Sequence, residues 1–309
     1  MTTITVASRE IQSASARLIQ IAEKARPWSL NFVPHIGLSS EEDGMFAPIV
    51  GPDPIEQIAL IGELGFKGIE DNFMRYRPID EQRRIAAALE KRDMRLATFV
   101  ATFATTGPAG SILANDSLTF ASRDDETRRL LKTEIKAAAE VSRRFGGGFA
   151  TVLSGRTDPR LPRDYQTANV IDNLRAVADI AADASLVLGL EPINARQWTG
   201  TFVTTVPHGN LIVQGVDHPN IRLIFDAYHV QIETGSILEN LELAWDSVGY
   251  VQIADAPGRN EPGSGEINYA PIFAELRKRE FDGFVGLEHG QSKPGAGANE
   301  GALQMLSRL

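Results

Sequence analysis

The sequence predicts a single (β/α)8 TIM barrel. Short apolar segments alternate with amphipathic segments of helical length about eight times along the 309 residues, which is the order of a parallel barrel. The last four of the eight expected strands are apolar almost throughout. This is expected where helices cover one side of a parallel sheet and side chains fill the other. No glycine-rich dinucleotide fingerprint follows the first strand, so a doubly wound open sheet ranks second.

The elements follow from local signals. Asp53-Pro54 begins a helix, because Asp caps it and Pro occupies its first turn, and Gly65 ends it. The connection from Ala101 to about Asp124 has the length that usually carries function. The expected strands are residues 30–36, 66–71, 94–99, 149–154, 186–191, 221–226, 250–254 and 284–288. The expected helices between and after them are about residues 54–65, 79–92, 125–144, 164–184, 207–216, 238–248 and 271–279, with a short helical piece at the end.

Two segments make up the chain. Residues 1–27 form an N-terminal extension, helical over about residues 8–25, without a signal-peptide pattern. Residues 28–309 form the barrel, since no linker interrupts them.

Composition excludes several classes of protein. Without cysteine there is no thiol catalysis, cysteine zinc site or iron–sulfur cluster, and a cytoplasmic location is expected. A net charge of −9 disfavours nucleic acid as the partner. No apolar run approaches the length of a membrane span. With nucleic acid and membrane both disfavoured, the expected partner is a small-molecule substrate. Association into a homo-oligomer stays open.

Polar side chains end several strands, where barrels of this kind place their chemistry. Carboxylates within apolar runs are costly unless they are paired, protonated or metal-bound. Four oxygen donors end or follow four consecutive strands, and they are Glu191, Asp226, Gln252 and Glu288. Three carboxylates at one point repel each other unless a cation lies between them, and oxygen ligands suit Mg²⁺ or Mn²⁺. We therefore expect a divalent metal site, although a structural salt bridge remains the alternative for each carboxylate taken alone.

Other polar residues at the same strand ends are candidates for binding a substrate. His229, three residues after Asp226, is placed to donate to a substrate oxygen or to act as an acid or base. Arg259, in the loop after the seventh strand, could clamp a carboxylate or hydroxyl group, or it could be a solvated loop residue. The remaining candidates are His35, Glu70 and Asn194.

At these residues the chain resembles the hydroxypyruvate isomerase family of the xylose-isomerase-like TIM barrel superfamily. The resemblance covers about residues 28–293. The matching segments are EPINAR from Glu191, DAYHVQ from Asp226, QIADAPGR from Gln252, EPGSGEINY from Glu261, GLE ending at Glu288 and FKGIE ending at Glu70. The segment from Gln252 to Tyr269 is the most specific of them.

The resemblance implies roles for these residues. Glu191 and Glu288 would be the acid/base pair, and both would join Asp226 and Gln252 in holding a metal. His229 and Arg259 would contact the substrate. The chain departs from the family pattern at residues 197–201 and in the loop after the third strand, which leaves the substrate open.

The expected reaction is an aldose–ketose type isomerisation of a small hydroxy-carbonyl acid, such as hydroxypyruvate, tartronate semialdehyde or a 2-oxo-tetronate. A proton would pass between adjacent carbons through an enediolate, with two glutamates as acid and base. A metal-dependent ketose 3-epimerase ranks second, because such families usually have His where this chain has Gln252. A sugar-acid lyase or dehydratase, an endonuclease and a non-enzymatic sugar-binding protein are more distant alternatives.

Overall fold

The computed structural model describes residues 2–102 and 119–308. Along the chain, eight parallel strands alternate with helices in the succession of a (β/α)8 barrel, which confirms the predicted fold class. The long connection expected between residues 101 and 124 lies mostly outside the described residues. The backbone divides into two compact units, which are residues 1–97 with 253–309, and residues 98–252.

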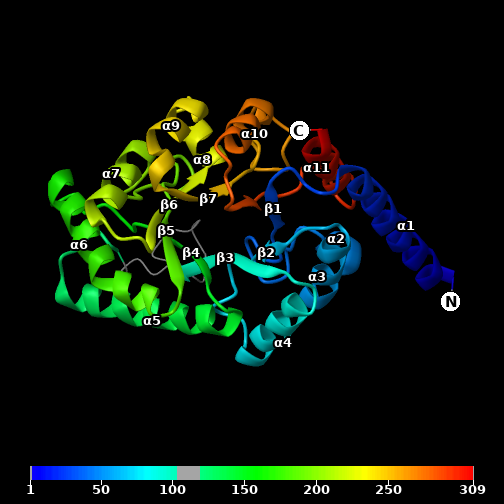
Figure 1. The fold of residues 1–309 in the computed structure, drawn as a ribbon, viewed down its shortest axis with the longest axis horizontal. Coiled ribbons are helices and arrows are strands. Elements are labelled where there is room, and N and C mark those ends of the chain that lie inside the picture. The colour runs from blue at the N-terminus through cyan, green and yellow to red at the C-terminus, as the bar shows by residue number, and fades with distance from the viewer. Residues whose placement is uncertain (1, 103–118, 309) are drawn as a thin grey trace. The chain divides into compact units, whose positions relative to one another are not determined.

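The first unit contains the N-terminal extension, the beginning of the barrel sequence and its end (Figure 1). Its strands are β1 (Asn31–Pro34), β2 (Gly68–Glu70), the first residues of β3 (Arg95–Thr102) and β8 (Phe284–Leu287). Its helices are α1 (Thr2–Ala25), α2 (Ala47–Val50), α3 (Pro54–Glu63), α4 (Ile79–Glu90), α10 (Tyr269–Lys278) and α11 (Gly297–Arg308).

β1 connects the other strands of the first unit. It pairs in parallel with β8, with Asn31 opposite Phe284. At its carboxyl end His35 forms a parallel bridge to Glu70, and Ile36 N donates a 2.8 Å hydrogen bond to Glu70 O. The carboxyl ends of β1, β2 and β8 therefore lie together.

The extension is a helix from Thr2 onward, longer than the residues 8–25 expected from its apolar face. It packs against α11, as Figure 1 shows at the end of the chain. Leu18 and Ala22 are fully buried, and Arg17 Nε lies 2.8 Å from Glu300 Oε1. The predicted short helical tail is thus a full helix that covers the extension's apolar stripe.

The second unit holds the remaining strands, β4 (Gly148–Val152), β5 (Leu186–Leu190), β6 (Ile221–Asp226) and β7 (Val248–Gln252), next to the end of β3. They are arranged in chain order, β3-β4-β5-β6-β7. Its helices are α5 (Asp125–Phe145), α6 (Arg163–Ala182), α7 (Val206–Val216), α8 (Ala227–Glu233) and α9 (Ile237–Ala244), followed by the 3-10 turn η1 (Trp245–Ser247). In Figure 1, α5 and α6 run side by side.

Phe149 explains two glycines of this sheet. A Cβ placed on Gly189 of β5 would lie 2.1 Å from the Phe149 ring, and one on Gly249 of β7 would lie 2.9 Å from it. The ring therefore occupies the space that side chains on β5 and β7 would fill, so these strands need glycine where Phe149 crosses them.

Two helices were absent from the sequence-based expectations. α8 begins directly after β6, where no separate helix was expected, and α2 is a four-residue turn after β1. Among the described residues, no helix is sufficiently long and apolar to cross a membrane.

Candidate functional site

The carboxyl ends of β5, β6 and β7 deliver three oxygen-bearing side chains in the second unit. Glu191 follows β5 directly, and its N–H bonds Val152 O of β4 at 3.1 Å. Asp226 and Gln252 are the last residues of β6 and β7, and they are partners across these strands. All three residues are buried. The predicted metal ligands are thus divided between the units, with Glu288 in the first.

Asp226 positions His229 through the helix that follows. Its Oδ1 accepts hydrogen bonds from the backbone N–H groups of Tyr228 at 2.8 Å and His229 at 3.4 Å, so Asp226 is the N-cap of α8. The first turn of α8 then places the His229 ring over the carboxylates. His229 Nε2 lies 3.5 Å from Asp226 Oδ2 and 3.6 Å from Glu191 Oε1.

Asn194 determines which nitrogen of His229 carries the proton. Its backbone N–H donates to Nδ1 at 3.3 Å, and its Nδ2 donates at 2.7 Å. The amide cannot be reversed without losing the bond from Gln197 N to Asn194 Oδ1, at 3.0 Å. Because Nδ1 accepts, the neutral ring carries its proton on Nε2, which faces the two carboxylates as a donor.

This cluster fits a divalent cation. One ligand atom each of Glu191, Asp226 and His229 lies within 4.8 Å of the others, and all three residues are buried. Burying a carboxylate is costly unless it is paired, protonated or metal-bound, and a cation between Glu191 and Asp226 would lower that cost. With the proton on Nε2, His229 is a donor rather than a ligand, so the oxygens of Glu191, Asp226 and Gln252 are the groups that would hold Mg²⁺ or Mn²⁺.

Glu288 forms the centre of a second cluster, in the first unit. It follows β8 directly and is 6% exposed. Its Oε2 accepts from Arg259 Nη2 at 2.5 Å, and its Oε1 accepts from Asn72 Nδ2 at 3.1 Å. Each carboxylate oxygen keeps a further lone pair, so the group can still take a proton.

The loop that carries Arg259 is organised by Asp255. The buried Asp255 carboxylate accepts from the backbone N–H groups of Ala256 and Ile267 at 2.9 Å and of Gly263 at 2.8 Å. Arg259 N donates to Asp255 O at 2.8 Å, and Arg259 adopts a left-handed backbone with φ of 54°. The loop therefore has one fixed path, and Arg259 occupies a strained position that this path imposes.

His35 and Glu70, the other expected substrate residues of the first unit, are both buried at the bridge between β1 and β2. His35 Nε2 lies 2.9 Å from His289 O and donates to it, which leaves Nδ1 as an acceptor. Burial lowers the pKa of His35, against the opposing charge of Asp43.

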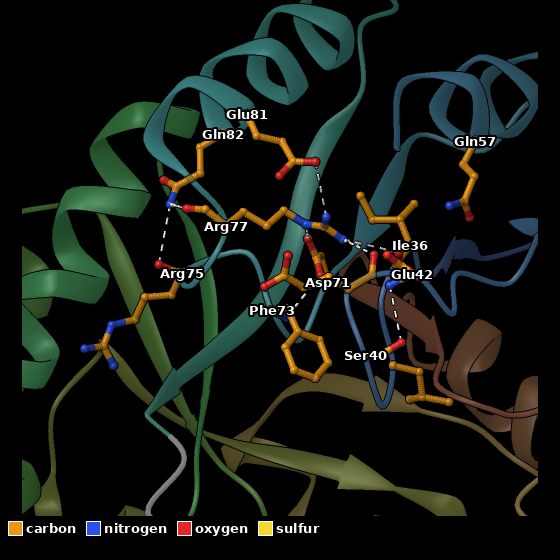
Figure 2. Close-up of polar contacts among 12 residues, drawn as sticks. Ile36, Ser40, Glu42, Gln57, Asp71, Phe73, Arg75, Arg77, Glu81 and Gln82 are labelled. Atoms are coloured by element: carbon orange, nitrogen blue, oxygen red, sulfur yellow. Dashed lines mark hydrogen bonds and ion pairs between the residues drawn. The ribbon is translucent and has the colours of Figure 1, made fainter. Parts of the chain in front are cut away.

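An ion pair that the sequence reasoning missed follows Glu70. Figure 2 shows Arg77 between Asp71 and Glu81, with its guanidinium directed at the segment from Ile36. Arg77 Nε lies 2.6 Å from Asp71 Oδ2, and both side chains are buried. Desolvation raises the pKa of Asp71 to about 6, although the Arg77 charge opposes this. Polar residues directly after the apolar strand, Asp71 and Asn72, were the available signal.

Comparison with known proteins identifies the family. Residues 58–309 match the family model described as xylose isomerase-like TIM barrel, and the chain belongs to that family. The match begins within α3, so it leaves out β1 and α2.

Named relatives within this family are isomerases. The chain is 28% identical to hydroxypyruvate isomerase of Escherichia coli, over 74% of this chain and 84% of that protein. It is 30% identical to a putative hydroxypyruvate isomerase of Xenopus laevis, over 77% and 85%. It is 32% identical to 2-oxo-tetronate isomerase of Cupriavidus necator, over 54% and 63%.

Solved structures show the same fold. A protein of Brucella melitensis described as AP endonuclease, family 2, superposes with a TM-score of 0.72 at 24% identity, covering 90% of this chain and 98% of that one. The 3-keto-D-glucoside 4-epimerase YcjR of E. coli superposes with a TM-score of 0.67 at 23% identity, covering 83% and 95%.

Proposed function

We propose that the protein is an isomerase that moves a carbonyl group between adjacent carbons of a small hydroxy-carbonyl acid. The observation that carries this proposal is the buried cluster of Glu191, Asp226 and His229 at the carboxyl ends of β5 and β6. The named isomerase relatives support the reaction class. Hydroxypyruvate and 2-oxo-tetronates are the substrates that these relatives suggest.

Glu191 and Glu288 are the proposed acid and base. Each is a buried carboxylate that directly follows a strand, and catalytic residues in a barrel of this kind come from these strand ends. One glutamate removes a proton from the hydroxyl-bearing carbon next to the carbonyl, and the electron pair of that C–H bond forms the double bond of an enediolate. The other glutamate delivers a proton to the former carbonyl carbon, and the hydroxyl proton moves to the other oxygen, so the substrate keeps its composition.

His229 and Arg259 would handle the substrate oxygens. His229 carries its proton on Nε2, so it donates to an oxygen on which charge develops in the enediolate. Arg259 offers a planar guanidinium suited to a substrate carboxylate. A divalent cation held by the oxygens of Glu191, Asp226 and Gln252 would polarise a carbonyl oxygen.

Isotope exchange tests this proposal. Wild-type protein is incubated in D₂O with hydroxypyruvate, tartronate semialdehyde, a 2-oxo-tetronate and common ketoses, and proton NMR follows each compound. Conversion to the isomer, with deuterium at one carbon, is the expected result. An epimer as the product would instead establish a 3-epimerase.

The roles of the glutamates are tested by Glu191→Gln and Glu288→Gln. Each variant keeps the size of the side chain but removes the acid/base group, and we expect turnover to fall by about a thousandfold or more. Glu300→Gln, whose carboxylate contacts Arg17 outside both clusters, is the control. Near-normal turnover in either variant would remove that glutamate from the mechanism.

A further inference from the structure

We propose that Asn72 is a positioning residue that holds the Glu288 carboxylate in its reactive orientation, supported by the buried pair of Asp71 and Arg77. This inference rests on the proposed role of Glu288 in proton transfer. It concerns side chains of the first unit alone, where every contact that it uses is made.

Asn72 is held at its backbone and at the amide of its side chain. Its backbone N–H donates to Gly37 O at 3.0 Å. Its Nδ2 donates to Leu38 O and to Glu288 Oε1, each at 3.1 Å. A reversed amide would set its oxygen against a carbonyl and a carboxylate, so both contacts fix the amide as a donor.

The Glu288 carboxylate is thereby held at both oxygens. Asn72 donates to Oε1, and Arg259 donates to Oε2 from the loop after β7. Two donors that approach from different segments determine the plane of the carboxylate. For a group that exchanges a proton with carbon, this plane decides whether a lone pair points at the reacting atom.

The pair of Asp71 and Arg77 keeps Asn72 in place from the adjacent position in the chain. Asp71 Oδ1 accepts from Phe73 N at 3.0 Å, which fixes the turn that contains Asn72. Arg77 Nη2 donates to Glu41 O at 2.9 Å and to Ile36 O at 3.4 Å, and Figure 2 shows the guanidinium directed at Ile36. The guanidinium thus ties the turn after β2 to the segment after β1 that also supplies Leu38 O.

Gly37 shows how closely the two segments approach. A Cβ at this position would lie 2.7 Å from Asp71 Oδ1 and 3.0 Å from Ser40 O. The absence of a side chain lets the segment after β1 reach the ion pair, and the same segment then bonds Asn72 through Gly37 O and Leu38 O. Glu288 is therefore oriented by a rigid arrangement of two loops rather than by a single mobile residue.

Kinetics of Asn72→Ala test the inference. The substrate is whichever of hydroxypyruvate or a 2-oxo-tetronate the wild type converts. Loss of one hydrogen bond to a charged group predicts a fall in kcat of about 10- to 100-fold, with KM changed much less.

Asn299→Ala is the matched control. Asn299 is a fully buried asparagine of the same unit whose Nδ2 donates to Met45 O and whose Oδ1 accepts from Gln291 Nε2. A general effect of removing a buried amide would appear in both variants. Asn72→Ser, a milder change, replaces Asn72→Ala should the latter not fold.

Crystal structures of wild type, Asn72→Ala and Asn299→Ala give a readout that does not need activity. The Glu288 carboxylate is expected to rotate or to adopt several orientations only in Asn72→Ala. An unchanged Glu288 orientation, or a kcat of Asn72→Ala equal to that of the control, overturns the positioning role. Full turnover of Glu288→Gln instead removes Glu288 from the mechanism, and failure of the wild type to isomerise any compound of the panel overturns the proposed function; in both cases the structures still decide whether Asn72 orients Glu288.

Discussion

Asn194 donates a 2.7 Å hydrogen bond to His229 Nδ1, and this contact decides what His229 can do. It places the proton on Nε2, 3.6 Å and 3.5 Å from the oxygens of Glu191 and Asp226. A histidine that would otherwise complete a metal site with two carboxylates is thereby made a hydrogen-bond donor.

Replacing the amide donor of Asn194 with a carboxylate acceptor is expected to change which metal ion the cluster prefers. In Asn194→Asp, a carboxylate oxygen replaces the amide donor at 2.7 Å from Nδ1. A proton on Nδ1 then donates to this carboxylate at the expense of the longer 3.3 Å contact from the backbone N–H of residue 194, and the Nε2 lone pair turns to Glu191 and Asp226. Binding of Zn²⁺, measured by calorimetry on metal-free protein, should tighten by about tenfold, while turnover falls. Asn210→Asp, a change at a buried asparagine of α7 in the same unit, is the control. Equal Zn²⁺ affinity in all three proteins would contradict the tautomer assignment.

Removal of divalent cations tests the role of the carboxylate cluster. After treatment with EDTA and dialysis, we expect turnover to fall by about tenfold or more and to return with Mn²⁺ or Mg²⁺. Asp226→Asn should weaken Mn²⁺ binding in calorimetry, because it removes one buried charge from the site. Unchanged turnover in protein shown by elemental analysis to be metal-free would leave a mechanism that depends on the glutamates alone.

Arg259→Lys is expected to weaken substrate binding more than it slows chemistry. Lysine keeps the charge but loses the planar pair of donors, so KM for an acidic substrate should rise by about tenfold. Steady-state kinetics give the two constants separately. Arg279→Lys, at a partly exposed ion pair with Glu275 on α10, is the control. A KM within twofold of wild type would show that Arg259 serves Glu288 and not the substrate.

Asp71 makes stability depend on pH in a direction opposite to that of an ordinary salt bridge. Its pKa is raised from 3.8 to about 6 by desolvation, so between these values the folded state holds a proton that the unfolded chain has released. The stability that this group contributes is present below about pH 4 and is lost as pH rises through about 6, by at most about 3 kcal/mol.

Denaturant unfolding of wild type and Asp71→Asn from pH 4 to pH 7 measures this effect. The free energy of unfolding of wild type, taken relative to the variant, should decrease as pH rises. Asp80→Asn, at an exposed pair with Arg83 on α4, is the control. An increase with pH would mean that the attraction of Arg77 outweighs the cost of burying Asp71.

The sequence predicted the barrel because its signals are local and repeat along the chain. Strand β6 lies at residues 221–226, as expected, and Asp53 caps α3 through a 2.8 Å bond from Ile55 N. It missed α8, since a helix that starts directly at a strand end leaves no loop to mark it. Asp226 caps the start of α8, but in the sequence it was interpreted only as a metal ligand.

The grouping of side chains was predicted where strand order alone decides it, and it was missed where it depends on a partner distant in sequence; the catalytic roles of these residues stay predictions. Glu191 and Asp226 were expected together and are together, because adjacent strands place them at one edge. Asn72 and Glu288 are in contact although 216 positions separate them in the sequence, and no local pattern predicts such a pair. The protonated nitrogen of His229 likewise depends on Asn194, which was selected only as a strand-end polar residue.

The single carboxylate of Asp255 gathers backbone N–H groups from Ala256, Gly263 and Ile267, so the spacing between these residues is set by geometry rather than by side-chain identity. Insertion or deletion of one residue there would withdraw at least one donor and displace Arg259. The loop can therefore exchange side chains at constant length and keep its path, whereas changes of length would have to arise elsewhere.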